Sequence, residues 1–183
     1  MIKDIIIKIP LVDQRKHTRN KKWAGKTCAI CSVKMLMTFE NQEHIEIPVM
    51  TLVNEARKLG GYIQGVGWKH KSLVKLARRY GVKLTFAKKF FKTDIQKLKG
   101  LKMAGRSILK GRPVAISLFY KLDPKNGGHV AVINGLKKDK NLVLGYHIQD
   151  PDPGFRGSNY YLSRKELLSG WRGGMIWFDT KGQ

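Results

Sequence analysis

The spacing of apolar residues changes near residue 110 of this 183-residue chain. Before that point, apolar residues recur three or four positions apart, which is typical of helices with one buried face. Beyond it, short runs rich in β-branched and aromatic residues are separated by Gly, Asn, Asp and Pro, which is typical of strands. Helices that precede a largely antiparallel sheet predict an α+β fold.

Local signals place the individual helices and strands. Helices are expected to begin at Cys28 and Pro48, to run over residues 72–81, and to begin at Thr93, where Gln96 completes a capping-box pattern. The other predicted segments are a polar loop at 11–27, a short helix begun by the capping box of Ser163 and Glu166, and strands at Ile5–Pro10, Val82–Ala87, Arg112–Tyr120, His129–Gly135, Leu142–Asp150 and Gly174–Asp179.

The length of the chain suits one domain with a buried core rather than two small domains. No internal repeat, low-complexity tract or linker interrupts the sequence. We therefore expect a single domain over residues 1–183, with a helical part over about 1–110 and a sheet part over about 111–183.

The charge of the chain is strongly positive. Lysine and arginine number 36 against 13 aspartates and glutamates, a formal net charge of +23. Such a field attracts polyanions, so non-specific nucleic acid or an acidic protein is a candidate partner. A solvated, lysine-rich surface accounts for the same composition, and no helix-turn-helix, zinc-ligand or aromatic RNA-binding motif accompanies the charge. Both interpretations stay open.

No stretch of the sequence resembles a transmembrane span. The opening "MIKDIIIKIP" has too short an apolar run for a signal peptide and lacks a small-residue cleavage site. Two cysteines do not form a secreted disulfide framework. These observations predict a cytoplasmic protein without a transmembrane segment.

The two cysteines, Cys28 and Cys31, lie in "GKTCAICSVKMLM" at the start of an expected helix. A redox dithiol usually follows a strand directly, whereas a long basic segment precedes this pair. A zinc site needs two further ligands, and His17, His44 and His70 lack a metal-like spacing. The remaining possibility is a catalytic thiol, which requires a histidine base and a group that orients it.

Cys28 is better placed than Cys31 for that role. The N-terminus of a helix stabilises a thiolate and can lower a thiol pKa from about 8.5 to about 3.5–7.5. Cys31 lies one turn further along the helix and is interpreted as a small core residue.

A histidine and an aspartate follow on two predicted neighbouring strands. His129 opens the first in "NGGHVAVING", and Asp150 ends the second in "GYHIQDPDP". An antiparallel hairpin would bring the two side chains together. Asp152 is an alternative orienting group, and His147 is interpreted as structural because alternation turns it away from Asp150. Each residue alone has an ordinary structural explanation, but their joint order predicts a Cys-His-Asp site.

In this order the motifs resemble papain-like cysteine peptidases of the family that trims double-glycine leaders from bacteriocin precursors, family thirty-nine of the cysteine peptidases. The family's glutamine, nucleophile, Gly-His strand and Asp-Pro strand end are matched here by Gln14 in "PLVDQ", Cys28, His129 and Asp150. Ala29 and Ile30 replace the usual Gly-Pro after the nucleophile. No transporter domain is recognised, so a stand-alone peptidase domain is expected.

The resemblance implies a papain-like fold and a cysteine-type peptidase that needs no cofactor or metal. Cys28 would attack the peptide carbonyl, His129 would pass the thiol proton to the leaving amine, and Asp150 would hold the His129 ring. The Cys28 N–H and the Gln14 side chain would stabilise the oxyanion, at about 3–4 kcal/mol per donor. Lys22 and the region of Trp23 are alternatives to Gln14. The implied substrate is a peptide or protein.

Other functions remain compatible with the same residues. The triad would also support acyl transfer or deamidation. A basic polyanion- or nucleic-acid-binding protein on a papain-like scaffold is a second class, because a fold does not dictate a function. A thiol–disulfide oxidoreductase that uses both cysteines is the third.

Overall fold

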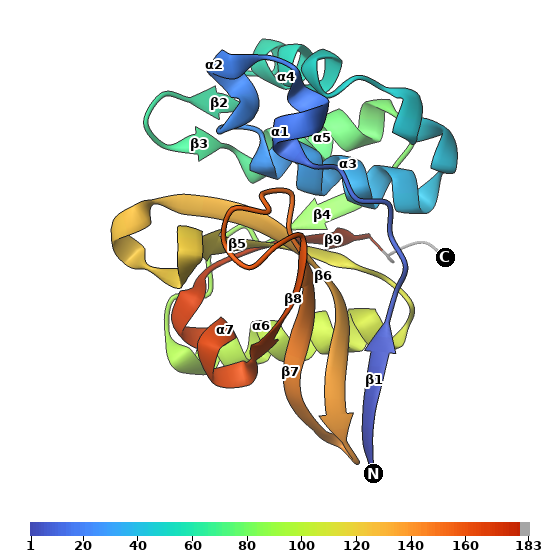
Figure 1. Ribbon diagram of the computed structural model, residues 1–183, viewed down its shortest axis with the longest axis vertical. Helices are drawn as coiled ribbons and strands as arrows, with labels where there is room; N and C mark the ends of the chain where they lie inside the picture. The colour runs from blue at the N-terminus through green and yellow to red at the C-terminus, as the bar shows by residue number, and fades with distance from the viewer. Residues whose placement is uncertain (180–183) are drawn as a thin grey trace.

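The computed structural model of the chain describes residues 1–179. In this part of the chain, one sheet contains seven strands. Six of them have the order β4-β9-β5-β6-β7-β8, and the seventh, β1, pairs with the C-terminal half of β6 (Figure 1). All of its strand pairs are antiparallel. The strands are β1 (Ile2–Ile6), β4 (Leu84–Phe86), β5 (Val114–Phe119), β6 (Gly128–Asp139), β7 (Leu142–Gln149), β8 (Asn159–Ser163) and β9 (Trp171–Phe178).

Both faces of this sheet are apolar, because successive side chains of a strand point to opposite faces. On β6, Val130 and Val132 pack in one core, whereas Ala131 and Ile133 pack in a second. Each core needs its own cover of helices, and the chain supplies one on each side of the sheet (Figure 1).

The first cover contains most of the N-terminal part of the chain. Its helix α3 is buried along nearly its whole length, from Ala29 to Thr38. The Ser32 hydroxyl donates to the Val130 carbonyl of β6 at 2.9 Å, which fixes α3 against the sheet. The elements of this layer are α1 (Gln14–Thr18), α2 (Lys21–Ala24), α3 (Cys28–Glu40), the 3-10 helix η1 (Gln42–Glu46), α4 (Val49–Lys58), the hairpin of β2 (Tyr62–Ile63) and β3 (Gly67–Trp68), and α5 (His70–Arg79).

The second cover consists of α6 (Asp94–Leu109) and α7 (Arg164–Gly170). Gly100 of α6 lies directly against the Trp171 ring, where any side chain would overlap it. The Tyr146 hydroxyl donates to the Leu101 carbonyl at 3.0 Å, which joins α6 to β7. Two short 3-10 helices, η2 (Tyr120–Leu122) and η3 (Pro124–Asn126), connect β5 to β6.

The α+β fold class is confirmed, as are the helices expected from local signals. Pro48 is the N-cap of α4, and α3 begins at Cys28. Both predicted capping boxes form, at the start of α6 and at the start of α7. Strands β1 and β4 join the sheet although they precede residue 110, so the helical and sheet parts interleave along the chain. The organisation as a single domain stays a prediction.

Two expectations about the N-terminal segment were wrong. Residues 11–27 are not a loop, because the side chains of Asp13 and Asn20 accept backbone N–H groups and start α1 and α2. The first strand covers Ile2–Ile6 rather than Ile5–Pro10, because its pairing with β6 sets the register. Strand β8 and the β2–β3 hairpin were not predicted.

No helix in the described part of the chain combines the length and the apolar character that crossing a bilayer requires.

Candidate active site

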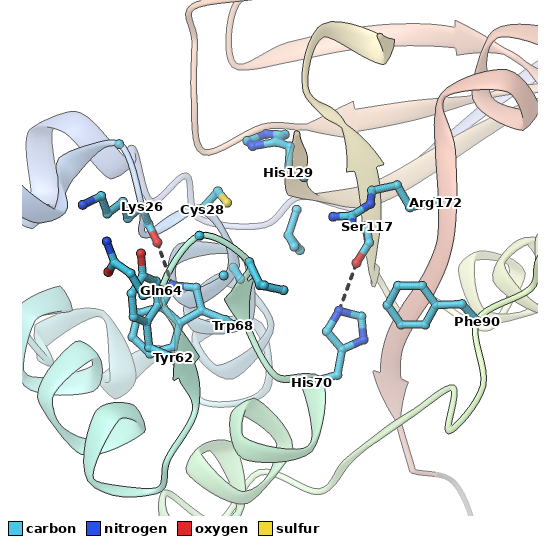
Figure 2. A pocket seen from close by; sticks show the side chains of 17 residues that line it. Lys26, Cys28, Tyr62, Gln64, Trp68, His70, Phe90, Ser117, His129 and Arg172 are labelled. Carbon is cyan, nitrogen blue, oxygen red and sulfur yellow. Dashed lines mark hydrogen bonds between the residues drawn. The ribbon is translucent and has the colours of Figure 1, made fainter. Parts of the chain in front are cut away.

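A cleft of about 480 Å³ lies between one part of the helical layer and the sheet. Figure 2 shows Cys28 on the helical side of this cleft and His129 on the sheet side. The lining residues come from the α2–α3 connection, the β2–β3 hairpin, the start of α5, and strands β5, β6 and β9. The first core cluster packs beneath both sides, so the two halves of the site are held by one body of buried residues.

Cys28 is the first residue of α3 and is partly exposed to the cleft. The N-cap residue Thr27 makes no side-chain cap to the helix, because its hydroxyl is hydrogen-bonded to the Thr18 hydroxyl at 2.8 Å. The first N–H groups of α3 therefore lack a side-chain acceptor. Such groups, together with the helix dipole, stabilise a negative charge on the sulfur.

Cys31 differs in every respect that matters for reactivity. It is fully buried, and burial raises the pKa of its thiol to about 12. Neither cysteine forms a disulfide. Cys31 therefore stays a neutral core residue at physiological pH, as its position in the helix predicts.

His129 and Asp150 meet as the strand order predicts. The His129 Nε2 donates to the Asp150 Oδ1 at 2.7 Å, and both side chains are almost completely buried. Burial lowers the pKa of His129, but the negative charge of Cys28 and the hydrogen bond to Asp150 outweigh it and raise the pKa to about 10. A pKa of about 10 keeps the His129 imidazole protonated at neutral pH.

The Asp150 carboxylate is itself held by two further donors. The Tyr160 hydroxyl of β8 donates to its Oδ2 at 2.7 Å, and the Asp152 N–H donates to its Oδ1 at 2.8 Å. With these contacts, the carboxylate orientation is set by β8 and by the turn after β7, so the ring of His129 has one preferred orientation.

The competing acidic and histidine residues lie elsewhere. The Asp152 carboxylate accepts from Arg15 Nε at 3.0 Å and from the Gly154 N–H at 3.0 Å. Burial raises the pKa of Asp152, but these donors lower it below its usual value overall. His147 faces the edge strand β1, where its Nε2 donates to Asp4 Oδ1 at 2.6 Å.

Gln14 lies next to the turn that carries Asp150. It is buried as the first residue of α1, and its backbone N–H donates to the Pro151 carbonyl at 2.8 Å. Its side-chain Oε1 is buried and has no hydrogen-bond partner among residues 1–179. Its role as an oxyanion donor stays a prediction.

Neither Gln14 nor its alternatives, Lys22 and Trp23, are among the residues that line the cleft. Lys22 is exposed on α2, and the Trp23 ring packs against Tyr62 and Trp68. Lys26 lines the cleft instead, and its carbonyl accepts from Trp68 Nε1 at 2.6 Å.

Sequence reasoning missed a polar group at the other end of the cleft. His70 Nε2 and Ser117 Oγ share a hydrogen bond of 2.9 Å, drawn in Figure 2, and Arg172 lies near them. In the sequence, His70 is one of three histidines that lack a metal-like spacing, and nothing there links it to Ser117. Its proximity to Ser117 comes from the packing of α5 on the sheet, which no local pattern encodes.

Acidification is expected to destabilise the protein through His70. Burial, and next the charge of Arg172, lower its pKa to about 4. Between about pH 6.5 and 4 the folded state then binds fewer protons than the unfolded state, so stability falls as the pH falls, by at most about 3 kcal/mol. Urea unfolding of the wild type and His70→Gln at about pH 7 and about pH 4 measures this loss.

The loss should be smaller in His70→Gln and unchanged in His17→Gln, which removes an exposed histidine. An equal loss in wild type and His70→Gln would contradict the assignment.

Comparison with known proteins identifies one family for nearly the whole chain. Residues 6–173 match the model of the peptidase C39-like family. A Bacillus anthracis protein described as a C39-like peptidase is 18% identical, with 99% of this chain and 100% of that chain covered and a TM-score of 0.66.

Two further solved structures share the fold. A double glycine motif protease from an AMS/PCAT transporter, solved with its leader peptide, is 16% identical over 95% of this chain and 94% of that chain, with a TM-score of 0.56. The peptidase domain of Streptococcus ComA, a bifunctional ABC transporter of a quorum-sensing pathway, is 16% identical over 94% and 96%, with a TM-score of 0.53. Comparison with curated protein sequences finds no match.

Proposed function

Because the chain belongs to the peptidase C39-like family and is a cysteine-type peptidase, we propose that it hydrolyses peptide bonds through Cys28, His129 and Asp150. The observation that carries this proposal is the buried hydrogen bond of 2.7 Å between His129 and Asp150, at the edge of a cleft that Cys28 also lines.

The geometry suggests how the proton moves. Because His129 Nε2 is bonded to Asp150, Nδ1 is the nitrogen that can share a proton with the Cys28 thiol. The thiolate attacks the peptide carbonyl, and the imidazolium donates its proton to the leaving amine. The neutral ring then removes a proton from water, which attacks the thioester and releases Cys28.

The developing oxyanion would be stabilised by the Cys28 N–H at the start of α3 and by the Gln14 side chain. Each donor is worth about 3–4 kcal/mol in the transition state. The burial of Gln14 beside the Asp150 turn supports this role, because a fixed donor costs little reorganisation.

A peptide is the substrate class that fits best. A double glycine motif protease of the same fold was solved in complex with a leader peptide, which supports a peptide as the substrate of this chain. The same residues would also transfer the acyl group to an amine instead of to water, and the nature of the acceptor separates the two outcomes. The charge of +23 leaves a polyanion contact as a prediction that neither the fold nor the comparisons support.

Alkylation by iodoacetamide tests the proposed nucleophile without knowledge of the substrate. Near pH 6, Cys28 is expected to react at least about 100-fold faster than Cys31, because only an activated, accessible thiol is a thiolate at that pH. Peptide mass mapping of the two sites measures the rates.

In denaturant the two cysteines should react alike, which serves as the control. Equal and slow reaction of both cysteines in the folded protein would refute the activated thiolate.

A further inference from the structure

Arg172 is a charged residue of the cleft that has no part in the proposed chemistry. It is the second residue of β9, and Figure 2 shows its side chain extending across the sheet side of the cleft above Ser117. Its guanidinium carbon lies 5.7 Å from the centre of the Phe119 ring. Its Nη1 lies so close to Gly128 that any side chain there would overlap it. The Arg172 guanidinium therefore lies beside Gly128, the residue that precedes His129.

No carboxylate pairs with Arg172 in the part of the chain that the structure describes. The arginines that have such partners are Arg15, Arg79, Arg112 and Arg156. Arg172 shares the lack of an ion pair with the remaining arginines of the described residues and differs from them in lining the cleft. A guanidinium that is packed against a ring but lacks an anion keeps its donors available for a ligand.

The surroundings of Arg172 favour an anion. The described residues that line the cleft include no aspartate or glutamate, and their permanently charged side chains are Lys26 and Arg172. His70, at the same end, is uncharged at neutral pH because burial and the charge of Arg172 lower its pKa to about 4. The Nδ1 of His70 is buried without a partner.

We propose that Arg172 determines specificity by binding a carboxylate of the peptide substrate close to the scissile bond. This inference rests on the proposed function, because it assigns the group to the same cleft. The planar guanidinium offers two parallel N–H donors to a carboxylate, a bidentate geometry that a single ammonium group lacks. The carboxylate is supplied by an acidic side chain or by the C-terminus of the peptide.

Two matched pairs of alkylating probes test the inference and distinguish these sources. The chloromethyl ketones of acetyl-Glu-Gly and acetyl-Gln-Gly differ in a side-chain charge, and bromoacetylglycine and bromoacetylglycinamide differ in a terminal charge. The measured quantity is the ratio of the alkylation rates of Cys28 by the charged and the neutral member, at about 0.15 M salt to screen the general basic field.

In the wild type, the charged member of at least one pair is expected to react about tenfold faster than the neutral member. Arg172→Gln should bring this ratio to about one, and Arg172→Lys should keep part of it because the charge remains without the planar fork. Arg78→Gln is the matched control, since it removes an exposed arginine of α5 outside the cleft and should leave the ratio unchanged.

Ratios near one for both pairs in the wild type, or ratios that Arg172→Gln does not lower, would overturn the assignment. The neutral probes separate this outcome from a failure of the proposed function. If they react with Cys28 only as fast as with an ordinary thiol, the proposed nucleophile is wrong, while the ratio still reports on Arg172.

Discussion

Replacing Cys28 by alanine is expected to lower the rate of peptide hydrolysis at least about 10⁴-fold, because the proposed acyl intermediate forms on the Cys28 sulfur. The rate is measured as the appearance of new peptide ends from a defined peptide mixture. Cys28 is only partly buried, so the urea midpoint of the variant should stay close to that of the wild type.

Cys31→Ala is the matched control for this variant. It removes a fully buried sulfur, so it should cost about 1 kcal/mol of stability and leave hydrolysis largely intact. A folded Cys28→Ala variant that still cleaves peptides would exclude Cys28 as the nucleophile. Loss of activity in folded Cys31→Ala would instead favour a reaction that uses both thiols.

Asp150→Asn is expected to reduce kcat by about 10³–10⁴-fold. The asparagine amide can present its NH₂ group to His129 Nε2, which favours the wrong tautomer of the ring. The substitution also removes a carboxylate that raises the pKa of His129. Because the leaving amine needs a protonated His129, the alkaline limb of the kcat profile should move to lower pH than in the wild type. The pH dependence of kcat for the two proteins measures both effects.

Asp152→Asn provides the comparison, since Asp152 bonds Arg15 rather than His129. It should reduce kcat less than about tenfold and leave the alkaline limb in place. A larger loss of kcat in folded Asp152→Asn than in Asp150→Asn would assign the orienting role to Asp152.

The proposed catalytic residues could be found from the sequence because each of them stands at the beginning or the end of a helix or strand. Cys28 begins a helix, His129 lies at the start of a strand, and Asp150 follows the end of the next strand. Antiparallel pairing of β6 and β7 joins Val132 to Gln149, which brings the strand ends together. Sequence periodicity therefore determined the elements, and hairpin geometry brought their ends into one site.

The other end of the cleft could not be predicted, because it depends on contacts between elements that are distant in sequence. Arg172 lies on β9 and Gly128 on β6, and both strands pair with β5. The long Arg172 side chain reaches Gly128 across β5. His70, at the start of α5, reaches Ser117 of β5 only because α5 packs on β4 at the edge of the same sheet. Neither residue carries a local pattern that separates it from the many other basic residues of the chain.

The helices α1 and α2 were missed for a different reason. They are short, and their caps, Asp13 and Asn20, lie within a polar segment that has no apolar periodicity. The first strand was misplaced because the run of isoleucines continues past Ile6, whereas pairing with β6 ends there. In both cases tertiary contacts decided what local composition left open.

Isotope incorporation during cleavage tests the proposed mechanism most directly. The wild type and Cys28→Ala are incubated with the same peptide mixture in water enriched in ¹⁸O, and the products are weighed by mass spectrometry. We expect the wild type alone to produce new C-termini that carry ¹⁸O from water, because water releases the acyl group from Cys28. Equal cleavage by Cys28→Ala, or products joined to an amine without ¹⁸O, would contradict hydrolysis through Cys28.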